Sequence, residues 1–183
     1  MKCMAIEQTR QWLEQTVIGE NFCPFAKREW DKQSIRYHVI EASGFQPVLE
    51  DLLAECQLLD NTPDMETSLL ILPHGFAGFV DFLTLLKTAE RLLALEGYEG
   101  IYQIASFHPQ YCFADADEAD AANYTNRSPY AMLHLLREAS LEKAIAAYDG
   151  DIEQVPQRNI EHARALGVQY FQARLQGLSV QFT

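Results

Sequence analysis

Hydrophobic and polar residues alternate along the first part of the chain with two different periods, which predict a helix followed by a strand. Apolar residues recur at helical spacing over about residues 5–18, and Gly19 is suited to end that helix. The later segment SIRYHVIEA instead places Ile35, Tyr37 and Val39 at every second position, as in a half-buried strand. We therefore expect an N-terminal helix that leads, through a loop, into the first strand of a sheet.

Two longer amphipathic helices and two more strands are predicted to follow. The helices are expected at QPVLEDLLAECQLLDN, where Pro47 suits the first turn, and at FVDFLTLLKTAERLLALEG, which Gly97 closes. Between them, TSLLILP contains a short continuous apolar run, as is typical of a strand buried on both faces, and IYQIASFHP is a further strand that ends at Pro109. The order strand, helix, strand, helix, strand with short links predicts two parallel, right-handed crossovers.

The last third of the chain is predicted to be helical. Pro129 is expected to begin a helix that reaches about Tyr148, and Pro156 a second helix that Gly167 ends, with a further helix at VQYFQARLQGL. The chain is thus predicted to be a single α/β domain with a small, mostly parallel sheet of three or slightly more strands, flanking helices and a helical C-terminal region. Its parts are an N-terminal helix (residues 1–19), a βαβαβ core (34–109), a loop (110–128) and the helical region (129–183).

The charge balance bears on which partners the protein can have. Its 183 residues include 26 acidic and 14 basic side chains, a formal net charge of −12. This argues against broad binding to nucleic acid, which rests on Lys and Arg neutralising phosphates, and against anionic membrane surfaces. No apolar run approaches the roughly 20 residues that span a bilayer. The charged N-terminus also lacks the apolar stretch of a signal peptide, so we expect a cytoplasmic protein whose four cysteines are reduced.

The segment NYTNRSPYAMLHLLRE gathers polar side chains around the predicted start of a helix. Ser128 can cap a free backbone N–H, and Pro129 suits the first helical position. Because a helix N-terminus attracts anions and Arg127 directly precedes it, we expect a site for a carboxylate or phosphate here. Alternatively, Asn123 and Asn126 satisfy the backbone of a turn, and the segment is only a well-capped helix.

Further along the same predicted helix lie three more side chains with candidate roles. Arg137 can bind the same anion or pair with an acidic neighbour in a structural salt bridge. His134 precedes Glu138 by one helical turn, so the two side chains are expected to touch. Glu138 would then orient His134 as a base.

The segment NFCPFA contains a candidate nucleophile. Cys23 precedes Pro24 just as Ser128 precedes Pro129, so Cys23 is expected to cap a short helix. A thiol at a helix N-terminus has a lowered pKa and is a better nucleophile or metal ligand. The alternative is that Cys23 is simply a small buried apolar residue.

His108 directly follows the third predicted strand, beyond the carboxyl end where parallel sheets bind their ligands. It can be a base, a metal ligand or a turn residue. Its spacing to Cys112 is compatible with two zinc ligands, and Cys23 or His134 can complete the set. The acidic tract DADEADAAN lacks the central glycine of a calcium loop, and neither a phosphate-binding loop nor a dinucleotide fingerprint is present.

Three of these segments together, NFCPFA, QIASFHPQYCF and NYTNRSPYAMLHLLRE, resemble the bacterial and plant family called domain of unknown function 1415. The resemblance extends from WLEQTVIGENFCPFA to VPQRNIEHARALG, which is nearly the whole chain. It implies motif positions and the expectation that the three segments form one site, but no reaction. By this resemblance the motif residues are Cys23, Pro24, His108, Pro109, Tyr111, Asn123, Asn126, Arg127, Ser128, Pro129, His134, Arg137 and Glu138.

The leading hypothesis from the sequence is an enzyme or ligand-binding protein that acts on a small anionic metabolite. Cys23 is expected to be the nucleophile or redox thiol, with His108 as its base. His134, oriented by Glu138, is the alternative base. The expected ligand-binding residues are Tyr111, Asn123, Asn126, Arg127, Ser128 and Arg137.

Two other functions stay open at this point. In a non-catalytic interaction or regulatory domain, the polar segments would brace the turn SFHPQYCF. In a mononuclear metal-binding protein, His108 would bind the metal together with Cys23 or His134. The sequence does not indicate the substrate, any cofactor or the oligomeric state.

Overall fold

The computed structural model describes residues 2–180 of the chain. Its helices are α1 (Lys2–Trp12), η1 (Leu13–Ile18), α2 (Ala26–Asp31), α3 (Phe45–Asn61), α4 (Phe79–Leu95), η2 (Ala121–Thr125), α5 (Glu138–Ala146), η3 (Ile152–Gln154), α6 (Val155–Leu166) and α7 (Val168–Val180). Its strands are β1 (Ile35–Val39), β2 (Thr67–Leu72), β3 (Tyr102–Phe107) and β4 (Ala131–Arg137). The α/β class is confirmed, as are the first three predicted strands and the helices between them. None of the helices within the described part of the chain has the length and apolar character that crossing a bilayer requires.

The strands form one mixed sheet in the order β1-β2-β4-β3. β1 pairs with β2 in parallel, whereas β4 pairs antiparallel with β2 on one side and with β3 on the other. The prediction of a mostly parallel sheet of three or slightly more strands is therefore not exact. The three predicted strands do run in the same direction, but β4 lies between β2 and β3 and is antiparallel to both.

The fourth strand occupies the first half of the segment in which a helix was predicted from Pro129 to about Tyr148. That half of the prediction is wrong, whereas the second half is helical as α5. Side chains alternate along β4, so that Leu133 and Leu135 belong to one core cluster and Met132 to the cluster on the other face. The short apolar run AMLHLLR fits either a helix or a strand, and strand pairing on both sides decides the outcome. Ser128 caps no helix; its hydroxyl donates to the carbonyl of Tyr130 at 2.6 Å.

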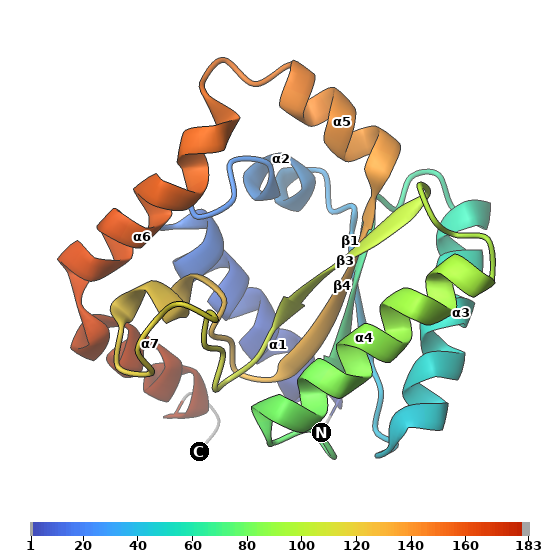
Figure 1. The fold of residues 1–183 in the computed structure, drawn as a ribbon, viewed down its shortest axis with the longest axis horizontal. Helices are drawn as coiled ribbons and strands as arrows, with labels where there is room; N and C mark the ends of the chain where they lie inside the picture. The colour runs from blue at the N-terminus through green and yellow to red at the C-terminus, as the bar shows by residue number, and fades with distance from the viewer. Residues whose placement is uncertain (1, 181–183) are drawn as a thin grey trace.

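Helices cover the two faces of the sheet unequally. α3 and α4 lie side by side over one face (Figure 1), where Leu52, Phe82 and Leu133 are among the fully buried residues. α1 and η1 lie against the other face, and Trp12 and Leu69 are almost completely buried there. The first face is a closed core, and the second is only partly covered.

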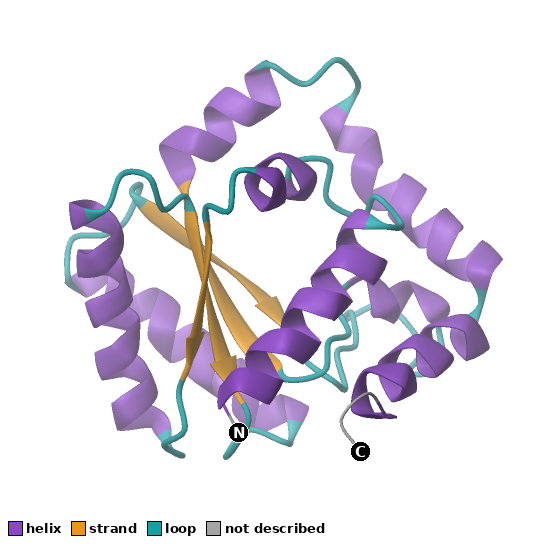
Figure 2. Cartoon of the chain, turned by 180° about the vertical axis from the view of Figure 1, so that it is seen from behind, coloured by secondary structure: helices purple, strands orange, loops and turns teal. Residues whose placement is uncertain are grey.

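The chain after the sheet forms an arch on the second side. α5 leaves the end of β4, the segment 147–154 turns, and α6 descends toward α7, as both views of the ribbon show (Figures 1 and 2). α5 has no buried side chain, whereas α6 packs with Ala163 fully buried beside Tyr124 and Phe171. The predicted helices from Pro156 to Gly167 and over VQYFQARLQGL are confirmed as α6 and α7.

Candidate functional site

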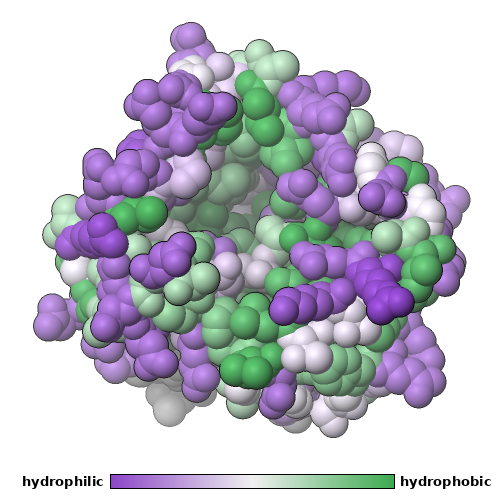
Figure 3. All heavy atoms as spheres, viewed as in Figure 1, coloured by the Kyte–Doolittle hydropathy of each residue, from purple (hydrophilic) through white to green (hydrophobic). Residues whose placement is uncertain are grey.

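A cavity of about 270 Å³ lies on the partly covered face of the sheet. All four strands, η1, α2 and α5 contribute to its walls, which include Trp12, Leu13, Leu69, Phe107, Leu136 and Leu141. Figure 3 shows a hollow in the upper half of the molecule with hydrophobic residues at its base. This cavity, which we call the first cavity, brings together three of the residues that the sequence singled out, Cys23, His134 and Arg137.

His134 is held in the first cavity by its neighbour on β2. Its Nε2 lies 2.7 Å from the hydroxyl of Thr67, and that hydroxyl donates to the carbonyl of Leu135 at 2.5 Å. Thr67 has only one hydroxyl proton, so it must accept from the N–H at Nε2 of His134. Nδ1 is then the acceptor nitrogen, and it has no hydrogen-bond partner within residues 2–180.

Burial determines the charge of this imidazole. The apolar surroundings lower the pKa of His134 to about 4, so the ring is neutral at pH 7. The contact predicted between His134 and Glu138 is wrong, because four residues along a strand separate two side chains by about 13 Å. Glu138 instead begins α5, and its backbone N–H donates to the carbonyl of Ile101 at 3.0 Å. The residue that orients His134 is Thr67, which sequence reasoning missed because only the pairing of β2 with β4 brings it there.

The predicted capping role of Cys23 is wrong, because the N-cap of α2 is Phe25 and no side chain caps this helix. Cys23 lies in the turn just before the helix start. Burial nevertheless raises the pKa of the thiol, although the backbone N–H groups of Phe25 and Ala26 beside the sulfur act in the opposite direction. The predicted lowering of the pKa of Cys23 is therefore wrong in direction. A protonated thiol packed with the apolar cluster of α1 and β1 lines the cavity and does not present a ready nucleophile.

His108 lies on the other face of the sheet and does not meet Cys23. It is completely buried between Phe79 and Phe82 of α4. Its Nε2 lies 2.9 Å from the carbonyl of Phe76, and its Nδ1 accepts the backbone N–H of Gln110 at 3.0 Å. Burial lowers the pKa of His108, and both ring nitrogens are occupied by the backbone. The ring thus braces the turn after β3.

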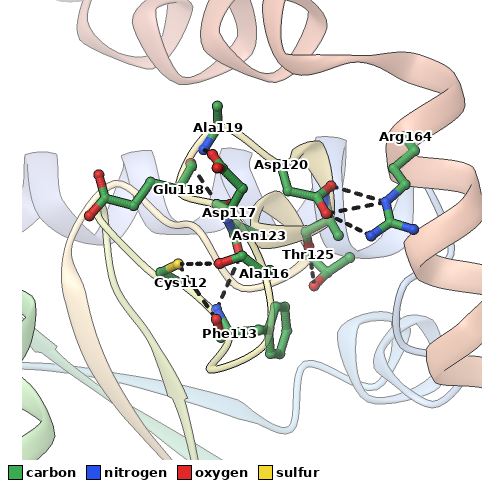
Figure 4. Close-up of polar contacts among 11 residues, drawn as sticks. Cys112, Phe113, Ala116, Asp117, Glu118, Ala119, Asp120, Asn123, Thr125 and Arg164 are labelled. Atoms are coloured by element: carbon green, nitrogen blue, oxygen red, sulfur yellow. Dashed lines mark hydrogen bonds and ion pairs between the residues drawn. The ribbon is translucent and has the colours of Figure 1, made fainter.

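The side chains within residues 2–180 do not form a metal-binding site. No group of three or more His, Cys, Asp or Glu side chains there is placed to hold an ion. Cys112, the expected partner of His108, lies 3.5 Å from the carbonyl of Ala116 and 3.6 Å from that of Phe113 (Figure 4). Both nitrogens of His108 are engaged, so it offers no lone pair.

Arg127 and Asn123 hold the acidic loop that follows β3. Arg127 donates to the carbonyl of Tyr111 at 3.0 Å and to that of Glu118 at 2.8 Å, and its guanidinium lies 4.7 Å from the centroid of the Tyr124 ring. The Asn123 amide accepts from Phe113 N–H and donates to the carbonyl of Asp117 (Figure 4). These hydrogen bonds make both side chains part of the scaffold.

The remaining expected ligand-binding residues also bond to the protein itself. Asn126 donates to the carbonyl of Ser106 at 3.2 Å, which ties the loop to the end of β3. The ring of Tyr111 packs against Phe79 and Phe113. Together with Arg127 and Asn123, these contacts match the alternative in which the polar segments brace the turn SFHPQYCF.

Arg137, the last residue of β4, forms a second set of structural hydrogen bonds. Its guanidinium donates to the carbonyls of Leu59 and Met65 and to the hydroxyl of Tyr102, at 2.5, 3.0 and 3.1 Å. The structural salt bridge expected for Arg137 is thus replaced by hydrogen bonds to backbone carbonyls. Arg137 and Arg127 do not converge on one anion.

One comparison with known proteins gives a result. A family model described as "Protein of unknown function (DUF1415)" matches residues 4–173, in agreement with the resemblance found from the three sequence segments. No curated protein and no solved structure matches the chain.

Proposed function

The chain belongs to this family of proteins of unknown function, and we propose that it binds a small, predominantly apolar organic molecule in the first cavity. The observation that carries the proposal is the neutral imidazole of His134, set among apolar walls with one acceptor nitrogen that no protein group uses. Binding sites for small molecules commonly combine apolar walls with a few placed polar groups. A ligand with one hydroxyl or N–H group satisfies both parts of this site.

The incomplete burial of α5 supports an apolar ligand. Leu141 and Ala144 line the first cavity, yet no side chain of α5 is buried. Burying apolar surface stabilises a complex by roughly 25 cal/mol per Å², so a ligand that covers these residues gains from the contact. α5 would then become the outer wall of the bound state.

Charge does not select the ligand at this site. Arg28 and Lys143 line the cavity from exposed positions, but Glu29 and Glu66 line it as well, and Arg28 pairs with Glu29 at 3.2 Å. Arg137 lines the cavity too, but its guanidinium already donates to backbone carbonyls and to the hydroxyl of Tyr102. The helix start predicted to bind an anion is absent at Ser128, where a strand follows. The proposed ligand is accordingly a neutral hydrogen-bond donor, and catalysis is not part of the proposal because the thiol of Cys23 is held protonated.

The test uses 1-naphthol, which has an apolar ring system and one hydroxyl donor. Isothermal titration should show binding to the wild-type protein, and Ala144→Phe should weaken it roughly ten-fold or more because the new ring occupies the cavity. Ala146→Phe is the matched control, since Ala146 lies on the same helix but is exposed and should leave binding unchanged. Equal binding by both variants, or no binding by the wild type, would contradict the proposal.

A second comparison isolates His134. The wild type should prefer 1-naphthol over 1-methylnaphthalene by roughly five-fold, the effect of one hydrogen bond of about 1 kcal/mol. His134→Leu keeps the apolar volume and removes the acceptor, so this preference should disappear. A preference that survives in the variant would assign the recognition to another group.

A further inference from the structure

A second cavity, of about 390 Å³, adjoins the first one. It lies between the turn before α2, the end of β3 and the start of α6, with Phe22, Phe113, Pro156 and Ile160 in its walls. Val17, Cys23 and Phe107 line both cavities. We call these three residues the waist. Because the same side chains line both spaces, the waist is the wall that the two cavities share.

A molecule in the second cavity does not need to form hydrogen bonds with its walls. Its polar side chains already have partners: Asn159 donates to the carbonyl of Phe22 at 2.6 Å, and Asn126 to that of Ser106 at 3.2 Å. Thr125 donates to the carbonyl of Ala122 at 2.9 Å. The remaining lining is apolar except for the thiol of Cys23, whose pKa is raised by burial. An occupant gains affinity there through apolar contact alone.

Nδ1 of His134, the acceptor that has no partner among residues 2–180, lies on the first-cavity side of the waist. The ring of His134 lies 6.1 Å from the ring of Phe107, measured between centroids. The combined space therefore has a polar end near the waist and, beyond the waist, an apolar region. A rigid ring system fits one cavity, whereas an occupant of both cavities has to be a flexible chain.

We propose that the two cavities form one elongated site for a long-chain amphiphile, with a hydrogen-bond-donating head at His134 and an unbranched alkyl tail that passes the waist into the second cavity. This inference rests on the proposed function, since it specifies the class of ligand that the first cavity binds. The tail would lie against Phe22, Phe113 and Ile160.

The chain-length dependence of binding tests the inference. Primary alcohols from 1-hexanol to 1-dodecanol would be titrated as competitors of 1-naphthol. If the tail enters the second cavity, affinity should rise across the whole series, by roughly four-fold for each added methylene. A plateau after the shortest alcohols, with 1-naphthol still bound, would overturn the inference and leave the proposed function standing. Failure of both 1-naphthol and the alcohols would overturn both.

A variant of the far wall makes the test specific to the second cavity. Ile160→Trp fills part of that cavity, so it should weaken 1-dodecanol at least ten-fold and leave 1-hexanol unchanged. Ala165→Trp introduces the same side chain at an exposed position of α6 and should leave both unchanged. Cys23→Leu, which narrows the waist, is the second variant if Ile160→Trp does not fold. Retention of full 1-dodecanol affinity by the folded variant would overturn the inference.

Discussion

At the scale of single residues, the environment of each side chain decides its chemistry. His134 donates to Thr67 through one ring nitrogen and keeps the other as an acceptor, a state that only the neutral imidazole can adopt. Cys23 shares its cavity, and burial raises the pKa of the thiol. Both residues are recognisable in the sequence as chemically capable, but their protonation follows from the apolar surroundings that the fold provides.

The depressed pKa of His134 predicts a pH dependence of stability. In the unfolded chain the imidazole takes up a proton below its ordinary pKa of 6.5, whereas in the folded protein it stays neutral down to a pKa of about 4. The unfolded state therefore binds more protons in this window, and stability falls as the pH falls. Between pH 7 and pH 5 this group should lower the free energy of unfolding by about 1–2 kcal/mol.

Urea denaturation at the two pH values measures this difference. His134→Leu should lose less stability than the wild type between pH 7 and pH 5. His74→Leu, at an exposed position in the loop after β2, serves as the control and should keep the wild-type loss. An identical loss in the wild type and in His134→Leu would show that His134 carries no such linkage.

At the scale of elements, β4 organises the molecule. It is inserted between β2 and β3, and its last residue, Arg137, bonds to the carbonyls of Leu59 and Met65 and to Tyr102. These partners come from the end of α3, the loop before β2 and the start of β3. The residue joins three parts of the chain at one end of the sheet.

Replacing Arg137 should therefore be destabilising. Arg137→Ala removes a half-buried guanidinium and leaves several carbonyls without donors, so the free energy of unfolding should fall by about 2–3 kcal/mol. Arg137→Lys should recover only part of this, because an ammonium group cannot reproduce the geometry of the guanidinium. Lys143→Ala, at an exposed cation on the neighbouring helix α5, should change stability by less than about 0.5 kcal/mol. A loss for Arg137→Ala as small as that for Lys143→Ala in urea denaturation would refute the assigned role.

At the scale of the whole molecule, the two faces of the sheet have different degrees of closure. α3 and α4 seal one face with many completely buried side chains, whereas the arch formed by α5 and α6 leaves two adjoining cavities on the other. On the face with the cavities, a bound ligand can therefore bury apolar side chains that are still partly exposed (Figure 3).

Hydrogen exchange should reveal this asymmetry. Amides of α5 should exchange much faster than those of the fully buried strand β2, since α5 has no buried side chain. Saturation with 1-naphthol should slow exchange in α5 and leave α3 unchanged, because Leu141 and Ala144 line the first cavity and α3 does not. Mass spectrometry of proteolytic fragments measures both effects. Slowed exchange in α3 alone would place the ligand on the face covered by α3 and α4, which contradicts binding in the first cavity.

Much of the fold could be predicted because long amphipathic patterns favour one local structure. α3 and α4 each extend over four to five turns, and β2 is apolar from Leu69 to Leu72 and buried at every position. The candidate site was harder to predict. Cys23 and His134 were identified. Arg127 and Asn123 were assigned to ligand binding and His108 to catalysis, but all three in fact bond to the backbone. A sequence shows which side chains can form hydrogen bonds, but it does not show whether their partners are ligands or backbone groups.

The sequence by itself determined the α/β class, the positions of most elements, the family and the residues able to carry chemistry. Only the tertiary structure decided that AMLHLLR is a strand, which face of the sheet His108 and His134 occupy, and that two cavities share Cys23 in their walls. The physical reason is the range of the interactions. Helical hydrogen bonds join residues four apart, so they can be inferred locally, whereas His134 pairs with Leu69 on one side and with Ala105 on the other. Those partners are distant in the chain, and folding alone brings them together.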